Sequence, residues 1–83
     1  MATSVYVGNL SYDTTEESLR TLFAEYGDIE AVRLITDRYT GRSKGFAFVE
    51  MSTDEAAEKA IDALNGKEVD GRELKIDKAK PRS

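Results

Sequence analysis

The apolar residues of this chain follow two different periods, and the order of these periods restricts the fold more than any other feature. Two segments repeat apolar residues at the i, i+3, i+4 and i+7 spacing of an amphipathic helix. Four shorter segments alternate apolar and polar side chains, as β-strands do: residues 4–9, 29–36, 44–51 and 73–77. The resulting order is strand, helix, strand, strand, helix, strand. It predicts an α+β domain.

Both predicted helices begin at a capping-box pattern and end near a glycine. The patterns are TTEE at 14–17 and STDE at 52–55, each with a Thr or Ser followed three residues later by Glu. Gly27 and the pair Asn65-Gly66 are typical of helix C-termini. The apolar stripes between these signals are Leu19, Leu22, Phe23 and Tyr26 in the first helix and Ala57, Ala60, Ile61 and Leu64 in the second.

The order β-α-β-β-α-β describes the ferredoxin-like split βαβ sandwich, in which two helices cover one face of a four-stranded antiparallel sheet. A turn signal at Asp70-Gly71 predicts a small hairpin before the last strand. Alternation assigns the helix-facing side to Val5, Val7, Val32, Leu34, Ala47, Val49, Met51, Leu74 and Ile76. It assigns the open side to Tyr6, Arg33, Lys44, Phe46, Phe48, Glu50, Lys75 and Asp77.

Length and composition narrow the classes of function. The 83 residues suffice for one domain, and we expect a core over about residues 4–78 and a basic tail at 79–83. Cysteine and histidine are absent, which removes thiol chemistry and the commonest general acid-base and transition-metal ligand. We therefore expect no enzyme, no metal and no cofactor. No apolar run approaches the ~18 residues that span a bilayer and no signal peptide is evident, so we expect a cytoplasmic protein without a membrane partner.

The net charge of −4 is unevenly distributed along the chain. Residues 13–30 and 52–70, which include both predicted helices, hold twelve of the sixteen acidic residues and three of the twelve Lys and Arg. Residues 31–51 and 71–83 hold the other basic residues. The position of charges decides a binding face, whereas the total affects solubility and long-range steering. An acidic total is therefore compatible with a basic open sheet face.

Three aromatic residues, Tyr6, Phe46 and Phe48, share the predicted open face with Lys and Arg. Unpaired bases stack on such rings, at ~1–3 kcal/mol per base, while cations contact the phosphates. This pattern favours a single-stranded nucleic acid. Segment 44–51, KGFAFVEM, resembles the longer signature of the RNA-recognition motif at every defined position but the last, and segment 5–10, VYVGNL, looks like the shorter signature. The resemblance covers essentially the whole chain. In layout it is similar to small single-motif RNA-binding proteins of bacteria, cyanobacteria in particular.

The resemblance implies roles for individual residues. Tyr6 and Phe48 would each stack a base, and Phe46 would pack against ribose. The basic residues implied at phosphates or base edges are Lys44, Arg33, Lys75, Lys78 and Lys80, together with the loop residues Arg38 and Arg42. We assign Glu50 and Asp77 to base edges, where a carboxylate can accept hydrogen bonds from exocyclic amines. The expected partner is single-stranded RNA, with single-stranded DNA as a further candidate, and the protein is expected to be a monomer.

One residue departs from the family pattern, and one other class of function stays open. Met51 stands where the pattern has an aromatic residue. Alternation places it toward the helices, so the change is expected to affect core packing, which methionine tolerates well. The alternative function is a protein-interaction module that uses the sheet face or the acidic helices, because exposed apolar patches also mark protein contacts.

Overall fold

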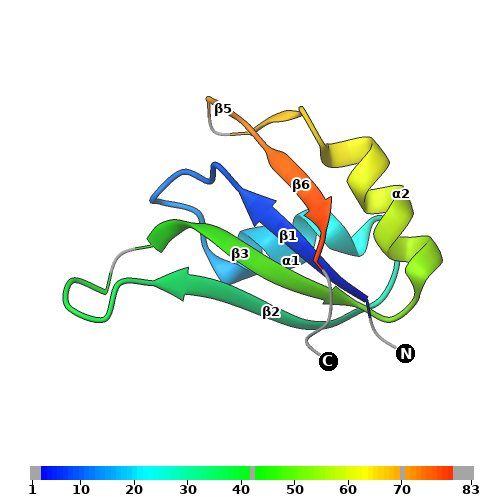
Figure 1. Ribbon diagram of the computed structural model, residues 1–83, viewed down its shortest axis with the longest axis horizontal. Helices are drawn as coiled ribbons and strands as arrows, with labels where there is room; N and C mark the ends of the chain where they lie inside the picture. The colour runs from blue at the N-terminus through cyan, green and yellow to red at the C-terminus, as the bar shows by residue number, and fades with distance from the viewer. Residues whose placement is uncertain (1–2, 42, 70, 80–83) are drawn as a thin grey trace.

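The computed structural model describes residues 3–41, 43–69 and 71–79, and its elements follow the predicted order (Figure 1). The helices are α1 (Glu16–Ala24) and α2 (Asp54–Leu64). The main sheet is antiparallel, in the order β2-β3-β1-β6, and consists of β1 (Thr3–Gly8), β2 (Ile29–Thr36), β3 (Ser43–Met51) and β6 (Lys75–Lys78). A separate two-stranded ladder is formed by β4 (Glu68–Val69) and β5 (Arg72–Glu73). The predicted fold class is confirmed.

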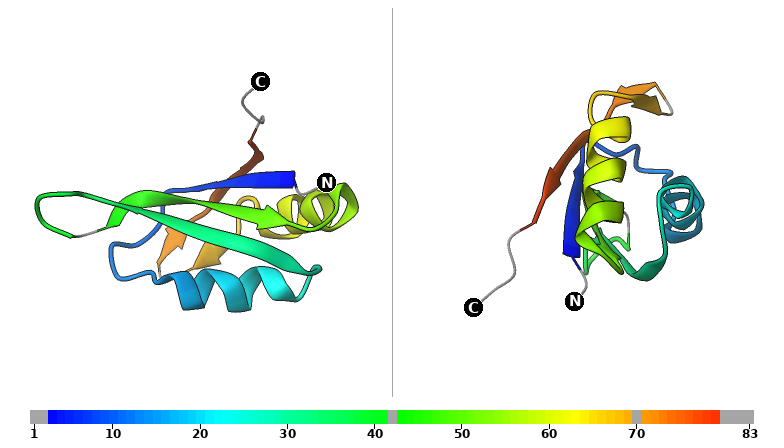
Figure 2. Two further views of the ribbon diagram at one scale, coloured as in Figure 1. Left: turned by 90° about the horizontal axis from the view of Figure 1, so that it is seen from below. Right: turned by 90° about the vertical axis from the view of Figure 1, so that its right-hand side faces the viewer.

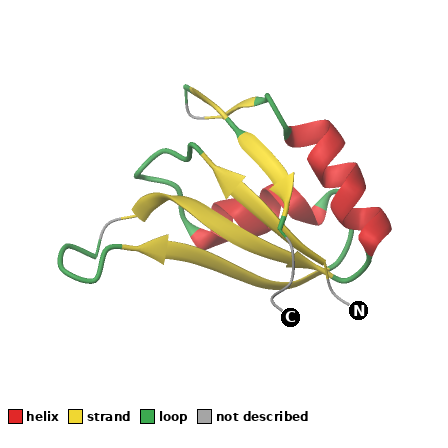
Figure 3. Ribbon diagram, viewed as in Figure 1, coloured by secondary structure: helices red, strands yellow, loops and turns green. Residues whose placement is uncertain are grey.

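Both helices lie on the same face of the main sheet. In the right-hand view of Figure 2, β1 and β6 lie on one side of the molecule while α1 and α2 lie on the other. Figure 3 shows the same layers from the front, with the strands in yellow before the red helix α1. No helix of the described residues therefore covers the outer face of the sheet. Neither helix of the described ranges is long and apolar enough to cross a membrane.

The hydrophobic core lies between the sheet and the helices. The predicted helix-facing residues are buried with one exception, since Leu34 is only partly buried. Leu34 belongs to β2, an edge strand, and the register between β2 and β3 shifts directly after it. The pairing of these two strands is therefore irregular next to Leu34, at the edge of the sheet. Tyr26, predicted to belong to the core, is also only partly buried and packs against its margin. Met51 is 0% exposed, as its position in the alternation predicts.

Both helices begin one residue later than the capping-box patterns predict. The Thr15 hydroxyl accepts a hydrogen bond from the Ser18 N–H at 3.1 Å, and the Thr53 hydroxyl accepts one from the Ala56 N–H at 3.1 Å. The third helical position is thus Ser or Ala, not Glu, and the prediction of two Glu capping boxes was wrong. A side-chain N-cap needs an acceptor oxygen on the residue just before the first helical residue, and here that oxygen is a hydroxyl. Where two hydroxyl residues are adjacent, the backbone path decides which of them serves, and in both helices it is the second.

Gly27 allows the chain after α1 to approach α2 closely. The helix ends at Ala24 and its C-cap is Glu25, so Gly27 is not the capping residue that its position suggested. A Cβ atom at Gly27 would lie 2.4 Å from the Cβ of Ala56 in α2. Real Cβ atoms do not make such short contacts. The glycine therefore lets the α1–β2 connection pack directly on α2.

The predicted last strand, residues 73–77, is divided at Leu74 into β5 and β6. The Leu74 side chain is 1% exposed, and its N–H donates to the Lys67 carbonyl at 2.9 Å. The hairpin predicted at Asp70-Gly71 is confirmed by the ladder between β4 and β5, although Asp70 itself lies outside the described residues. The hairpin forms a sheet of its own, and β6 alone is the fourth strand of the main sheet.

Candidate nucleic-acid interface

Three aromatic side chains form one cluster on the outer face of the sheet, which we call the aromatic platform. Tyr6 extends from β1, and Phe46 and Phe48 extend from β3; all three are partly exposed. The ring centroids are 5.9 Å apart for Tyr6 and Phe48, 6.1 Å for the two Phe rings, and 6.2 Å for Tyr6 and Phe46. Aromatic rings attract one another at such distances. The three rings therefore form a continuous apolar surface.

Alternation along β1 and β3 explains why these rings point outward. The residues on either side of Tyr6 and Phe48 in the two strands are all 0% exposed on the helix side: Val5, Val7, Ala47 and Val49. Successive side chains of a strand point to opposite faces, so Tyr6 and Phe48 must face away from the helices. The antiparallel register places these two residues directly opposite each other. Strand pairing thus unites rings that are far apart in the sequence.

The strand that carries both Phe rings has an irregular start. The register between β2 and β3 shifts between Leu34 and Thr36. Opposite this shift, Gly45 has a φ of 86°, a conformation that favours glycine. The Gly45 carbonyl accepts a hydrogen bond from the Leu10 N–H at 2.8 Å. This bond fixes the segment after β1 to the strand that carries the Phe rings.

One row of paired residues crosses the whole sheet through the platform. Arg33 of β2 is paired with Phe48, Phe48 with Tyr6, and Tyr6 with Asp77 of β6. Arg33 and Asp77 are both exposed, as is Lys75, two residues before Asp77 on the same side of β6. The platform is therefore bordered by an arginine on one edge strand and by a lysine and a carboxylate on the other.

Glu50 extends this outer surface along β3. It is partly exposed, lies two residues beyond Phe48, and is paired with Ser4 of β1 and Ala31 of β2. Both neighbours are small, so the carboxylate has room to reach a ligand on the sheet. The structure thus brings seven of the predicted site residues together on one face: Tyr6, Arg33, Phe48, Glu50, Lys75, Asp77 and, from the start of β3, Phe46.

Lys78 lies on the helix side of the sheet rather than with the rings. Its Nζ is 3.8 Å from Oδ1 of Asp54 at the start of α2. The same carboxyl oxygen accepts a hydrogen bond from the Thr3 hydroxyl. This hydrogen bond, followed by the charge of Lys78, holds the pKa of Asp54 below its ordinary value. Lys78 therefore joins β6 to α2, a contact that the sequence pattern did not indicate.

For three of the predicted basic residues, the structure does not describe the side chain. Arg42 and Lys80 lie outside the described residues, and for Lys44 only the backbone, in β3, is described. Their roles remain predictions. Arg38 is exposed in the turn between β2 and β3. In that turn the Asp37 carboxylate accepts a hydrogen bond from the Tyr39 N–H at 2.7 Å, so the turn has a defined conformation next to the sheet.

Sequence reasoning missed the contacts that fix the segment after β1. Asn9 has a φ of 59°, a conformation in which asparagine is enriched among non-glycine residues, and its Nδ2 donates to the Glu73 carbonyl at 2.6 Å. The guanidinium of Arg72 lies over the Tyr12 ring at 5.5 Å. Both contacts join the β1–α1 connection to β5. The pair Gly8-Asn9, where the first strand ends, was the available signal, because Gly-Asn is typical of turns.

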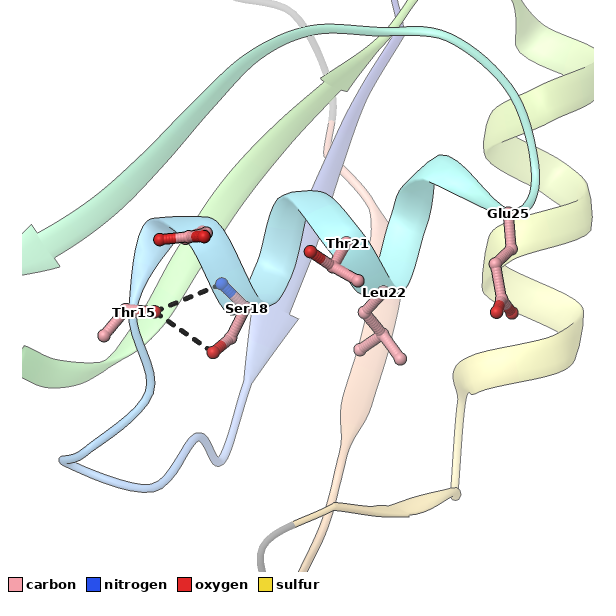
Figure 4. Close-up of a pocket in the computed structure, with 6 residues that line it drawn as sticks. Thr15, Ser18, Thr21, Leu22 and Glu25 are labelled. Atoms are coloured by element: carbon pink, nitrogen blue, oxygen red, sulfur yellow. Dashed lines mark hydrogen bonds between the residues drawn. The ribbon is translucent and has the colours of Figure 1, made fainter.

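A polar hollow on the outer side of α1 offers no comparable chemistry (Figure 4). It is lined by Thr15, Glu17, Ser18, Thr21, Leu22 and Glu25. The Thr15 hydroxyl caps the helix: it forms hydrogen bonds with the Ser18 N–H and with the Ser18 hydroxyl. Within the ranges that the structure describes, no group of three or more Asp and Glu is arranged to hold a metal ion.

Comparison with known proteins gives a consistent result. The family model of the RNA recognition motif matches residues 5–75. A protein of Nostoc named for RNA binding, RbpB, is 61% identical over 79 residues, which are 95% of this chain and 77% of that protein. The crystal structure of the RNA-binding protein PG1 is 46% identical, covers 98% of both chains and has a TM-score of 0.93. A structure of the Rna15 RRM with bound RNA (GU) is 36% identical, with 94% and 83% coverage and a TM-score of 0.86.

Proposed function

The chain belongs to the RNA recognition motif family, and from this premise we propose that it binds single-stranded RNA on the outer face of its sheet without catalysing a reaction. The observation that carries the proposal is the aromatic platform of Tyr6, Phe46 and Phe48, with centroids about 6 Å apart. Each unpaired base has a π-face that can stack on a ring. A platform of three rings is large enough for roughly two or three bases.

The platform suits a single strand better than a duplex. Bases in a duplex are stacked on one another and do not offer their faces to a protein, whereas bases of a loop or single strand do. Arg33 and Lys75 on the edge strands are exposed beside the rings, where phosphates of a strand crossing the sheet would pass. The remaining cations proposed for phosphates or base edges are Lys44, Arg38, Arg42 and Lys80, whereas Lys78 faces α2 and is not among them.

Sequence preference is proposed to come from the two carboxylates of the face. Asp77 is paired with Tyr6 across the strands, and Glu50 follows Phe48 along β3. A carboxylate repels phosphate but accepts hydrogen bonds from the exocyclic amines of bases. A base stacked on Tyr6 would lie next to Asp77, and one stacked on Phe48 next to Glu50. We therefore infer a modest preference for bases that carry an amino group.

We propose that the protein acts as a monomer in the cytoplasm. The outward N–H groups along this edge of the sheet already have partners. Leu74, just before β6, donates to the Lys67 carbonyl, and within β6 Ile76 donates to the Asn65 side chain at 3.1 Å and Lys78 to the Asp77 carboxylate. An edge strand with free N–H groups would be a template for pairing with a second chain. Sedimentation at several concentrations tests the oligomeric state, and imaging of a fluorescent fusion tests the location.

The proposed function is tested by titrating the labelled protein with a short RNA of degenerate sequence and following backbone chemical shifts. Shifts should map to the outer face of β1, β3 and β6. Shifts confined to the helices, or none at the sheet, would contradict the proposal and favour the protein-interaction alternative. The same titration with single-stranded DNA measures the preference for ribose, and pools with one position held constant measure the preference for each base.

A further inference from the structure

Gly8, at the end of β1, lies beneath the Tyr6 ring. A Cβ atom built at Gly8 would be 2.6 Å from the Tyr6 hydroxyl oxygen, 2.8 Å from Cε2 and 2.9 Å from Cζ. Contacts under 3.0 Å are essentially never made by real Cβ atoms. The end of the phenol ring therefore occupies the space that any side chain at residue 8 would take. The ring leans along its own strand rather than standing upright from it.

The backbone conformation does not require glycine at this position. Five other glycines of the chain have a positive φ, but Gly8 does not. A glycine inside a strand loses conformational entropy on folding and contributes no side chain to packing, so it is unfavourable unless something needs the space. At residue 8 the space is filled by the Tyr6 ring. The side chain of Tyr6, not the local backbone, explains this glycine.

The neighbouring rings restrict where the Tyr6 ring could move. On the β3 side it has Phe48 at 5.9 Å and Phe46 at 6.2 Å between centroids. A methyl group at residue 8 would push the ring away from the strand, and the two Phe rings block movement toward β3. The remaining directions are outward into solvent and sideways toward β6. Either movement would change the angle and height at which the ring meets a base.

We propose that Gly8 is a positioning residue for base stacking: its missing side chain lets the Tyr6 ring lie against β1 and present one face to the RNA. The proposal rests on the proposed RNA-binding function of the platform. It extends that function by a residue that itself touches no base. A different role is conceivable in physical terms, in which residue 8 is small so that the RNA backbone can approach it directly. The two roles predict different effects on RNA affinity when substitutions at residues 6 and 8 are combined.

The test is a double-mutant cycle on RNA affinity with Gly8→Ala, Tyr6→Leu and the double variant, using fluorescence anisotropy and a short degenerate RNA. Tyr6→Leu removes the atoms that a methyl group at residue 8 would meet. Gly8→Ala alone should lower affinity by about fivefold or more, but not beyond the loss caused by Tyr6→Leu, because one stacked base is worth ~1–3 kcal/mol. In the Tyr6→Leu background Gly8→Ala should have no further effect.

The outcomes separate the proposals. An equal loss from Gly8→Ala in both backgrounds would mean direct contact with RNA and would overturn the positioning role, as would unchanged affinity of Gly8→Ala alone. If Tyr6→Leu itself leaves affinity unchanged, the proposed function of the platform fails, and the role of Gly8 fails with it. If Gly8→Ala does not fold, Tyr6→Leu should restore folding, and absence of that rescue would contradict the proposal.

A second measurement reads the position of the ring directly. Displacement of the Tyr6 ring changes its ring-current effect on Phe46 and Phe48, so the ring proton shifts of both Phe residues should change in Gly8→Ala. The methyl shifts of the core residues Val5 and Val49, on the opposite face, should stay close to their wild-type values. A general loss of structure would instead move both sets of shifts.

Discussion

Tyr6 and Phe48 are directly opposite each other on the two central strands, with ring centroids 5.9 Å apart and ring planes at 61°. Both rings face away from the helices, although each could have been buried if its strand were shifted by one residue. Large apolar side chains exposed as a pair are uncommon on a surface that has no partner. The pair is therefore the centre of the expected binding site, and it supplies the first prediction.

Phe48→Ala and Tyr6→Ala should each weaken binding of a short single-stranded RNA by ~1–3 kcal/mol, because each removes one stacking ring. The measurement is a fluorescence anisotropy titration at one stated salt concentration. Tyr12→Ala is the matched control: this tyrosine is 63% exposed but lies in the connection after β1, under Arg72, and its loss should leave affinity unchanged. Equal effects at Tyr12 and Phe48 would contradict a specific platform.

Arg33→Ala should weaken binding of all RNA sequences to a similar degree and reduce its dependence on salt. Each phosphate contact on a single strand contributes about 0.7 to the slope of log affinity against log salt concentration, because binding releases counterions. The slope should fall by about this amount if Arg33 contacts one phosphate. Arg20→Ala changes the same charge on α1, away from the sheet face, and serves as the control. A reduction of the slope by both variants alike would assign the effect to overall charge.

Asp54→Asn should lower the thermal stability of the protein at neutral pH and have progressively less effect in acid. The Thr3 hydroxyl, followed by Lys78, holds the pKa of Asp54 below its ordinary value in the folded state. The carboxylate therefore stabilises the fold above the ordinary pKa of aspartate, and this stabilisation is lost as the pH falls through the lowered folded value. Melting temperatures of both proteins, measured from neutral to acidic pH, should converge. A difference that is constant with pH would contradict the linkage.

Gly27→Ala should destabilise the fold by ~1–3 kcal/mol, as overpacking of a tightly packed site does. The added methyl would overlap Ala56, whose Cβ lies 2.4 Å from its position. Denaturant unfolding measures the loss. The double variant Gly27→Ala, Ala56→Gly should lose less than the sum of the two single variants, because removal of one Cβ relieves the overlap. Strict additivity would show that the two positions do not meet.

Local sequence patterns predicted several features of the fold and of the site correctly. They failed where a feature depends on the path of the backbone or on a contact between residues that are distant in sequence. The faces of Phe46 and Phe48 could be predicted because alternation within a strand depends on neighbouring residues alone. The N-caps were predicted one residue early, at positions where two hydroxyl residues stand side by side and the path of the backbone selects between them. The side of Lys78 follows from alternation, two residues after the buried Ile76, but its contact with Asp54 depends on a residue that is distant in sequence.

Side-chain period and the order of elements were enough to predict which residues face the helices, which face solvent, and that three rings share the open face. Three relations appear only in the folded protein: Tyr6 pairs with Phe48, Arg33 and Asp77 end the same row, and the Tyr6 ring lies over Gly8. Those relations depend on strand register and on the volume left by each neighbour. Register and volume are fixed only when the strands and helices pack together.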